Sequence, residues 1–250
     1  MCSSDLLERV IAGRWLTANA VIGFAPANTI NDDDIEIYTD DSRANVAFTW
    51  RNLRQQNAKR EGVANKCLAD YTAPKLINGK PSGVADYIGM FAVTTGLGIE
   101  KKEKEFENLL DDYSSIMLKA IADRLAEAFT ECLHERVRKD LWGYAATEAL
   151  SNEALVKEAY QGIRPAPGYP ACPGHGVKRD LFAHLQAGEI GMMLTESFSM
   201  FPAASVSGFY FAHPQADYFN VGPIGDDQVK DLAKRTGLAD DVVRRELTAG

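Results

Sequence analysis

The chain has 250 residues, of which 46% are hydrophobic and 25% charged, as in soluble globular proteins with one large domain or two small ones. Its formal net charge of −8 argues against nucleic acid or an anionic membrane as the main partner, because both require a basic surface. No apolar run approaches the roughly 18 residues of a membrane span, and the first residues lack the apolar core of a signal peptide, so the sequence predicts a cytoplasmic protein.

The four cysteines lie far apart in the sequence, at Cys2, Cys67, Cys132 and Cys172. A disulfide framework requires an oxidising compartment, and nothing in the sequence directs the chain to one. The cysteines are therefore expected to be free thiols.

The first part of the chain is expected to hold one short helix, at residues 5–16, followed by strands. Apolar segments that are bounded by turn residues predict these strands, at residues 18–27, 35–38, 45–50 and 87–95. The run Asn31 to Asp34 is a turn, and the two strands after it form a hairpin.

The clearest periodicity lies between Glu100 and Lys139, where apolar residues recur mostly at steps of three and four. This spacing predicts a long amphipathic helix with one break. A shorter helix is expected at residues 152–160, and Gly162 ends it before a proline-rich loop.

The last part of the chain is expected to form strands at residues 191–198 and 205–212, with residues 217–221 as the hairpin partner of the second. Two helices close the chain, at residues 226–236 and 239–247. The chain is thus expected to begin with strands, to continue with long helices and to return to strands. This order predicts a single α+β domain with an antiparallel sheet flanked by long helices.

The stretch from Arg164 to Cys172 carries three prolines, which fit neither a helix interior nor a central strand because each lacks an N–H and has a fixed φ. A stiff, extended loop that presents Arg164 and Tyr169 is expected, with Gly168 supplying a backbone angle closed to its neighbours. A guanidinium and an aromatic ring suit a ligand with a carboxylate at one end and a flat ring at the other. A purely structural proline loop is the alternative. Glu158, six residues before Arg164, would line the same pocket or be an ordinary surface residue.

Other patterns carry less chemistry. Cys172 and His175 have the spacing of metal ligands, but no second pair lies at a matching distance, so no metal is expected. The motifs of serine hydrolases, nucleotide-binding loops and zinc proteases do not occur. On the long helix, four-residue spacing is best read as a solvated charged stripe, formed by Glu127, Glu131, Glu135, His134 and Arg138.

Many ordered blocks of the sequence resemble one family over almost the whole length from about residue 21. They include Asp33 to Tyr38, Leu53 to Gln56, Ala85 to Gly89, Ala122 to Ala128, His134 to Arg138, Tyr160 to Cys172 and Leu194 to Phe198. The chain resembles the activation domain of cobalamin-dependent methionine synthase, a 5-methyltetrahydrofolate–homocysteine methyltransferase of methionine biosynthesis.

The resemblance implies a function in the repair of the cobalamin cofactor. Such a domain binds S-adenosylmethionine in a shallow groove and supports reductive remethylation of cob(II)alamin to methylcobalamin. The cobalamin belongs to a partner module of methionine synthase, and a flavodoxin-like protein or flavoprotein reductase supplies the electron. Because donor and cofactor carry the chemistry, no catalytic residue and no directly bound metal are expected, and the domain alone should not turn over.

The resemblance also assigns residues to the S-adenosylmethionine site. The R-x-x-x-G-Y motif of the family falls on Arg164, Gly168 and Tyr169. Arg164 would pair with the methionyl carboxylate, while Ala166 and Tyr169 would contact the nucleoside. An aromatic pair that the family places on a strand falls on Tyr218 and Phe219, and the acidic positions near the site fall on Glu158 and Glu127.

One departure from the family concerns the start of the chain. The family usually opens with a helix whose aspartate contacts S-adenosylmethionine, and residues 1–4 resemble nothing in that segment. The helix is therefore expected to be missing. This leaves open a non-catalytic docking or regulatory module for a cobalamin-binding partner, and, as a third hypothesis, a stand-alone methyltransferase.

Overall fold

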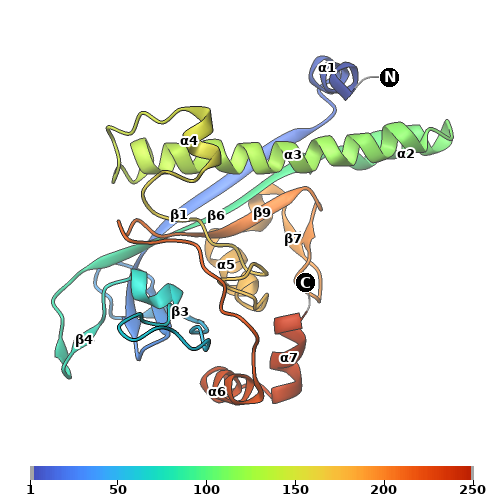
Figure 1. Ribbon diagram of the computed structural model, residues 1–250. Helices are drawn as coiled ribbons and strands as arrows, with labels where there is room; N and C mark the ends of the chain where they lie inside the picture. The colour runs from blue at the N-terminus through green and yellow to red at the C-terminus, as the bar shows by residue number, and fades with distance from the viewer. Residues whose placement is uncertain (1–2, 249–250) are drawn as a thin grey trace.

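The computed structural model describes residues 3–248, and its centre is one antiparallel sheet of five strands in the order β3-β2-β1-β6-β9 (Figure 1). The strands of this sheet are β1 Thr17–Ile30, β2 Asp34–Tyr38, β3 Val46–Arg51, β6 Asp86–Leu97 and β9 Ser205–Tyr210. Two small hairpins lie outside it, formed by β4 Leu76–Ile77 with β5 Lys80–Pro81 and by β7 Met193–Leu194 with β8 Met200–Phe201.

Helices cover both faces of the sheet, and others lie beside it. The helices of the described residues are α1 Ser3–Gly13, α2 Ile99–Asn108, α3 Asp112–Arg136, α4 Asn152–Val156, α5 Val177–Leu185, α6 Asp226–Thr236 and α7 Asp240–Thr248. Short 3-10 turns form η1 Leu68–Tyr71 and η3 Ala187–Ile190, and one π-helical turn forms η2 Val137–Leu141. Figure 1 shows α3 running across one face of the sheet and α5 packed against the other. The α+β architecture predicted from the sequence is confirmed.

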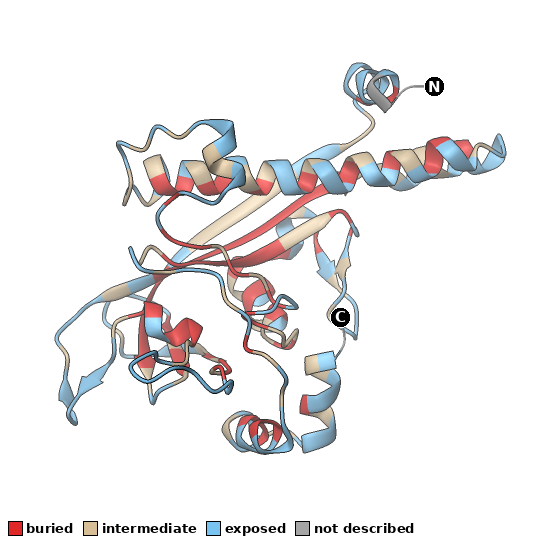
Figure 2. Cartoon of the chain, in the orientation of Figure 1, coloured by how far each residue is buried: buried red, intermediate tan, exposed pale blue. Residues whose placement is uncertain are grey.

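Strand β6 is buried on both faces, which explains why its sequence is a continuous apolar run rather than an alternating one. Successive side chains of a strand point to opposite faces. Met90 and Ala92 join the core that is formed with α5, while Phe91 and Val93 join the core formed with the end of α3. Figure 2 shows this burial along the middle of β6 and the second half of β9.

The expected break in the long helix lies between α2 and α3. Leu110 there has a φ of 56° in the left-handed region, and the Asp111 side chain accepts a hydrogen bond from the Ser114 N–H at 3.0 Å. Aspartate is among the best helix N-caps because its carboxylate satisfies one of the free N–H groups of the first turn. The prediction of one broken helix is confirmed.

The strand expected at residues 191–198 is wrong in all but Met193 and Leu194. Residues Ala187–Ile190 form a 3-10 turn, and beyond the two-residue strand the Thr195 side chain accepts a hydrogen bond from the Ser199 N–H at 3.1 Å. Serine and threonine side chains that bond to nearby backbone N–H groups in this way replace the hydrogen bonds of a sheet. The helix α5 was not expected from the sequence.

Residues 217–221 do not pair with β9, so the expected hairpin is also wrong. One edge of β9 pairs with β6, and the other edge is covered by the start of the proline-rich loop, through an antiparallel bridge between Ile163 and Phe211. Residues 217–221 instead cross that loop, where the Val221 N–H donates to the Pro170 carbonyl at 3.0 Å.

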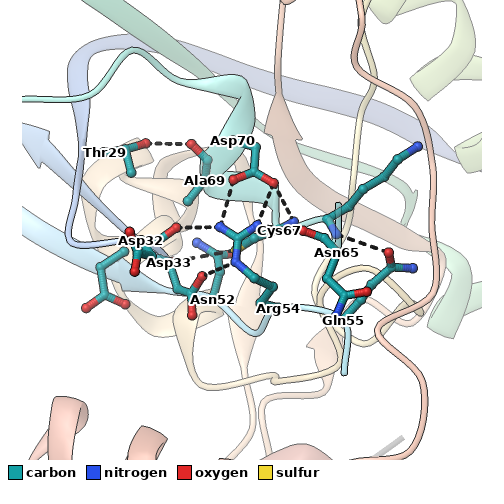
Figure 3. Close-up of polar contacts among 12 residues, drawn as sticks. Thr29, Asp32, Asp33, Asn52, Arg54, Gln55, Asn65, Cys67, Ala69 and Asp70 are labelled. Carbon is teal, nitrogen blue, oxygen red and sulfur yellow. Dashed lines mark hydrogen bonds and ion pairs between the residues drawn. The ribbon is translucent and has the colours of Figure 1, made fainter. Parts of the chain in front are cut away.

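Arg54 joins three loop segments near the β1–β2 turn (Figure 3). Its guanidinium pairs with Asp33 at 2.8 Å and with Asp70 at 2.7 Å, and it donates to the carbonyls of Asp32 and Asn65 at 2.7 Å each. A planar fork with five donors can satisfy this many acceptors at fixed angles, whereas lysine cannot. The cluster holds the polar stretch after β3 against the body of the domain.

The two closing helices form a small core of their own. Val229, Leu232 and Val243 pack there against Leu53 and Val221. Both helices were expected from the sequence, and Gly237 ends α6 in the left-handed conformation that favours glycine.

Cys67, Cys132 and Cys172 are free thiols, as expected, while Cys2 lies outside the described residues. Within residues 3–248, no helix combines the length and the apolar character that crossing a bilayer would require.

Candidate functional site

The proline-rich loop begins as an added strand along the free edge of β9. The Ile163 N–H donates to the Phe211 carbonyl and the Phe211 N–H donates to the Ile163 carbonyl, both at 3.0 Å, and the Phe209 N–H donates to the Pro165 carbonyl at 3.0 Å. Gly162 permits this approach, because a β-carbon there would stand 2.3 Å from the Phe211 carbonyl oxygen. The backbone on both sides of Arg164 is thereby fixed to the sheet.

After Pro165 the loop is a compact turn rather than the extended ribbon expected from the sequence. The Tyr169 N–H donates to the Ala166 carbonyl at 3.2 Å, and the Gly168 N–H donates to the Cys172 carbonyl at 2.8 Å. Gly168 has a φ of +97°, which side-chain-bearing residues rarely adopt. Pro167 and Pro170 stiffen the turn without needing N–H partners, so it holds its shape with few hydrogen bonds of its own.

A pocket of about 540 Å³ opens between this turn, the α3 helix and residues 217–221. Its volume lies in the range of small-molecule sites, about 300–1,000 Å³. Seven of the eight site residues expected from the sequence line it, namely Glu127, Glu158, Arg164, Ala166, Tyr169, Tyr218 and Phe219. Gly168, the eighth, does not line the pocket and instead shapes the turn. Residues from α3, the loop before Arg164 and the segment after β9 therefore meet at one place.

Arg164 is half-buried at the pocket and held by three partners. Its Nη1 donates to the Tyr160 hydroxyl at 2.6 Å and to His134 Nδ1 at 3.1 Å, and its Nη2 pairs with Glu131 at 2.5 Å. Burial opposes the charge, but the electrostatic attraction of Tyr160, Tyr218 and Glu131 outweighs it and raises the pKa of the guanidinium. Arg164 is therefore a fixed cation, not a mobile surface side chain.

The rim of the pocket is more open. Tyr169 is 59% exposed and Tyr218 38% exposed, so both rings offer free surface. Tyr218 also has a structural contact, since its hydroxyl accepts the Arg164 backbone N–H at 3.0 Å. Glu127 and Glu158 are exposed carboxylates at the same opening. An aromatic wall, two carboxylates and one guanidinium suit a ligand with a flat ring, positive charge and a carboxylate.

A buried polar layer lies beneath Arg164, and the expectation of a solvated charged stripe is wrong for His134 and Arg138, whereas Glu127 is exposed as expected. His134 and Arg138 are both 0% exposed. Arg138 makes a fork to Glu148, with Nη2 to Oε1 at 2.7 Å and Nε to Oε2 at 2.9 Å, and its guanidinium lies 4.2 Å from the centre of the Tyr160 ring. The π-helical turn that starts at Val137 carries Arg138 into this layer, and such turns often occur at functional sites.

Sequence reasoning missed Glu131, His134 and Tyr160 as members of the site. The three-residue step from Glu131 to His134 places both on one face of a helix, but spacing alone does not distinguish a buried polar face from a solvated one. Tyr160 precedes Arg164 by four residues, and only the fold brings its hydroxyl to the guanidinium.

Cys172 and His175 do not form the beginning of a metal site. Cys172 is buried, and burial raises the pKa of its thiol to about 12. His175 Nδ1 lies 2.9 Å from the Lys178 ammonium, which can only donate to it. Across residues 3–248, no group of three or more histidine, cysteine, aspartate or glutamate side chains is arranged to hold a metal ion.

Comparison with known proteins agrees with this architecture. Residues 3–237 match the family model of the vitamin B12 dependent methionine synthase activation domain, so the match includes α1. A solved structure, described as the crystal structure of the MetH reactivation domain bound to AdoHcy, is 53% identical in sequence and superposes with a TM-score of 0.91. The alignment covers 99% of this chain and 74% of that one. The chain thus belongs to the activation-domain family of vitamin B12-dependent methionine synthase, as the sequence blocks had predicted.

Proposed function

We propose that the pocket around Arg164 binds S-adenosylmethionine and that the protein supports the reductive remethylation of cobalamin on a partner module. The observation that carries the proposal is the fixed guanidinium of Arg164 in a pocket that also presents the Tyr169 ring and the carboxylates of Glu127 and Glu158. The related structure with 53% identity is bound to AdoHcy, which is what remains of S-adenosylmethionine after methyl transfer.

Each site residue has a distinct role in this proposal. Arg164 pairs with the methionyl carboxylate, a charge-assisted contact that guanidinium geometry favours. The turn of Ala166, Gly168 and Tyr169 contacts the nucleoside, and Tyr218 with Phe219 forms the facing wall. Glu127 and Glu158 attract the positive charges of the ammonium and sulfonium groups. S-adenosylhomocysteine keeps the ammonium group but has no sulfonium charge.

The residues of this chain bind and orient the donor. The cobalamin of the partner module supplies a nucleophile strong enough to take the methyl group without acid or base assistance from protein. Holding two reactants in line is itself a large rate effect. A flavodoxin-like protein or a flavoprotein reductase is the proposed electron source. The whole chain, residues 1–250, acts as one cytoplasmic domain within this methyltransferase system and does not turn over alone.

Isothermal titration with S-adenosylmethionine tests the binding step. Arg164→Ala should weaken binding by about 2 kcal/mol or more, roughly 30-fold, which is the scale of a hydrogen bond between charged groups. Arg164→Lys should recover only part of this, because it keeps the charge but lacks the fork. Arg245→Ala is the matched control, since that arginine is 74% exposed on α7 and is not one of the residues that line the pocket. Saturable binding that is unaffected by Arg164→Ala would contradict the proposed site.

A docking or regulatory module is the alternative that the family fold also permits. It predicts no heat with S-adenosylmethionine but retained association with a cobalamin-carrying module, measured by titration of that module. A stand-alone methyltransferase would instead release S-adenosylhomocysteine from a small nucleophile without any corrinoid.

A further inference from the structure

His134 lies directly behind Arg164 and is enclosed by protein. Its side chain is 0% exposed, its ring stacks on Tyr210 at 5.1 Å between centres, and the Tyr160 ring lies nearly perpendicular to it, with 4.9 Å between centres. Its two nitrogens face Arg164 at 3.1 Å and the Tyr144 hydroxyl at 3.4 Å. Nothing about this histidine suggests contact with a ligand, so any role it has must act through Arg164.

The contact with Arg164 fixes the protonation state of the ring. A guanidinium can only donate hydrogen bonds, so Nδ1 of His134 must accept, and the single ring proton then sits on Nε2, facing Tyr144. Burial, followed by the charges of Arg138 and Arg164, lowers the pKa of His134 to about 2. The same layer holds the carboxylates of Glu131 and Glu148, which pair with Arg164 and Arg138, and the hydroxyl groups of Tyr144, Tyr160 and Tyr210, and the net direction of the pKa shift is still downward.

The donors of Arg164 can be counted. A guanidinium has five N–H groups. Nη1 uses both of its hydrogens, on His134 and Tyr160, and Nη2 uses one on Glu131, which binds through Oε2 alone. Among residues 3–248, no acceptor takes the Nε hydrogen or the second hydrogen of Nη2. Nε and Nη2 form one edge of the group, the edge that Arg138 uses to grip Glu148 in this same protein.

We propose that His134 is a positioning residue that locks the guanidinium of Arg164 through Nη1 and so reserves the Nε edge for a ligand carboxylate. The inference rests on the proposed function above, in which Arg164 binds the carboxylate of S-adenosylmethionine. A neutral acceptor is required at this position. A second carboxylate beside Glu131 would repel the carboxylate of the ligand, and a protonated histidine could not accept the hydrogen bond at all.

Three substitutions of His134 distinguish the effect of its hydrogen-bond acceptor from the effect of its stacked ring. His134→Phe keeps the stacked ring and removes both nitrogens, His134→Asn keeps an acceptor near the position of Nδ1, and His134→Gln places its amide nearer the position of Nε2. His184→Phe on α5 is the matched control, because that histidine packs against Phe48 away from the pocket. Binding of S-adenosylmethionine should weaken about tenfold in His134→Phe and His134→Gln and largely recover in His134→Asn.

Decarboxylated S-adenosylmethionine is the second probe. It lacks the group that Arg164 would grip, so all four variants should bind it within about twofold of the unsubstituted protein. A loss in His134→Phe that is equal for both ligands would assign the residue a merely structural role and overturn the proposal. Unchanged binding of S-adenosylmethionine by His134→Phe, while Arg164→Ala weakens it, would also overturn it. If Arg164→Ala itself has no effect, the proposed function fails instead.

The protonation state of His134 can also be measured on the unsubstituted protein, so this test does not depend on the folding of a variant. Nitrogen-15 NMR of the histidine rings distinguishes the two neutral tautomers from the protonated ring. His134 should remain neutral with its proton on Nε2 from about pH 8 to about pH 5, a range that spans the ordinary histidine pKa near 6.5. A proton on Nδ1, or protonation within that range, would contradict the locking contact.

Discussion

The ring of His175 lies against the α-carbon of Gly168, so close that a β-carbon at residue 168 would stand 2.4 Å from Cε1 of that ring. The backbone of His175 is in turn held by α7, where its N–H donates to the Glu246 carbonyl at 3.2 Å. The turn that carries Tyr169 is therefore supported from behind by the last helix of the protein, although these segments are far apart in sequence.

Gly168→Ala should destabilise the protein by about 2 kcal/mol and weaken S-adenosylmethionine binding about tenfold. The φ of +97° is unfavourable for alanine, at a cost of about 1–3 kcal/mol, and the ring of His175 must also move. Urea unfolding and titration calorimetry measure the two effects. Adding His175→Ala should relieve the steric part and leave the backbone part. A Gly168→Ala protein as stable as the parent would show that the turn adopts another conformation.

Tyr218→Phe should weaken S-adenosylmethionine binding by about threefold to tenfold. The lost hydroxyl accepts the Arg164 backbone N–H at 3.0 Å, and an unsatisfied N–H costs about 1 kcal/mol or more. Tyr113→Phe is the matched control, since that tyrosine is 57% exposed on α3 and does not line the pocket, so its loss of a hydroxyl should leave binding like the parent. Equal affinities of all three proteins in calorimetry would assign the Tyr218 hydroxyl no part in fixing Arg164.

Breaking the buried pair of Arg138 and Glu148 should be costly. The side chains are 0% and 7% exposed, and removing one partner strands a charge in a region with little water. Arg138→Met should therefore lower the free energy of unfolding by about 3–5 kcal/mol. The double variant Arg138→Met/Glu148→Leu should recover most of that loss in denaturant titrations. Additive losses in the two single variants would mean that the pair is not coupled.

The stability of the protein should fall with acidity because of His134. Its pKa is about 2 in the fold against 6.5 ordinarily, so below about pH 6.5 only the unfolded chain takes up this proton. One such group contributes a slope of at most about 1.4 kcal/mol per pH unit. The slope should be absent in His134→Phe, so the difference in unfolding free energy between the two proteins should shrink from pH 7 towards about pH 4.5. Parallel profiles would show that the ring takes up its proton over the same pH range in the fold as in the unfolded chain.

Arg54→Lys should reduce the free energy of unfolding by about 1–2 kcal/mol. The guanidinium pairs with Asp33 and Asp70 and donates to two carbonyls, and an ammonium cannot reach all of them at once. Because Arg54 and both carboxylates are partly exposed, solvent screening limits the effect. Arg60→Lys, at an exposed position a few residues on, should change nothing. Proteolysis of residues 55–66 should be faster in Arg54→Lys than in Arg60→Lys.

Several elements follow from local sequence alone. The central strands are apolar runs bounded by turn residues, and the long helix has an unambiguous three- and four-residue period with a break that Asp111 caps. These features depend on side chains close together in the chain. The family motif at Arg164, Gly168 and Tyr169 likewise identifies, from the order of residues alone, side chains and a turn that the fold brings to one pocket.

Only the tertiary structure decided what lies beside β9 and what lies beneath Arg164. The edge of β9 is paired by Ile163 to Pro165 rather than by the aromatic segment that follows it, because backbone hydrogen bonds do not depend on which residues supply them. The polar residues between Glu127 and Arg138 look like a solvated stripe by spacing, yet His134 and Arg138 are buried because Tyr160, Glu148 and Arg164 arrive from later in the chain and supply contacts for them. A sequence records which polar groups need partners, whereas the fold alone determines whether water or protein supplies them.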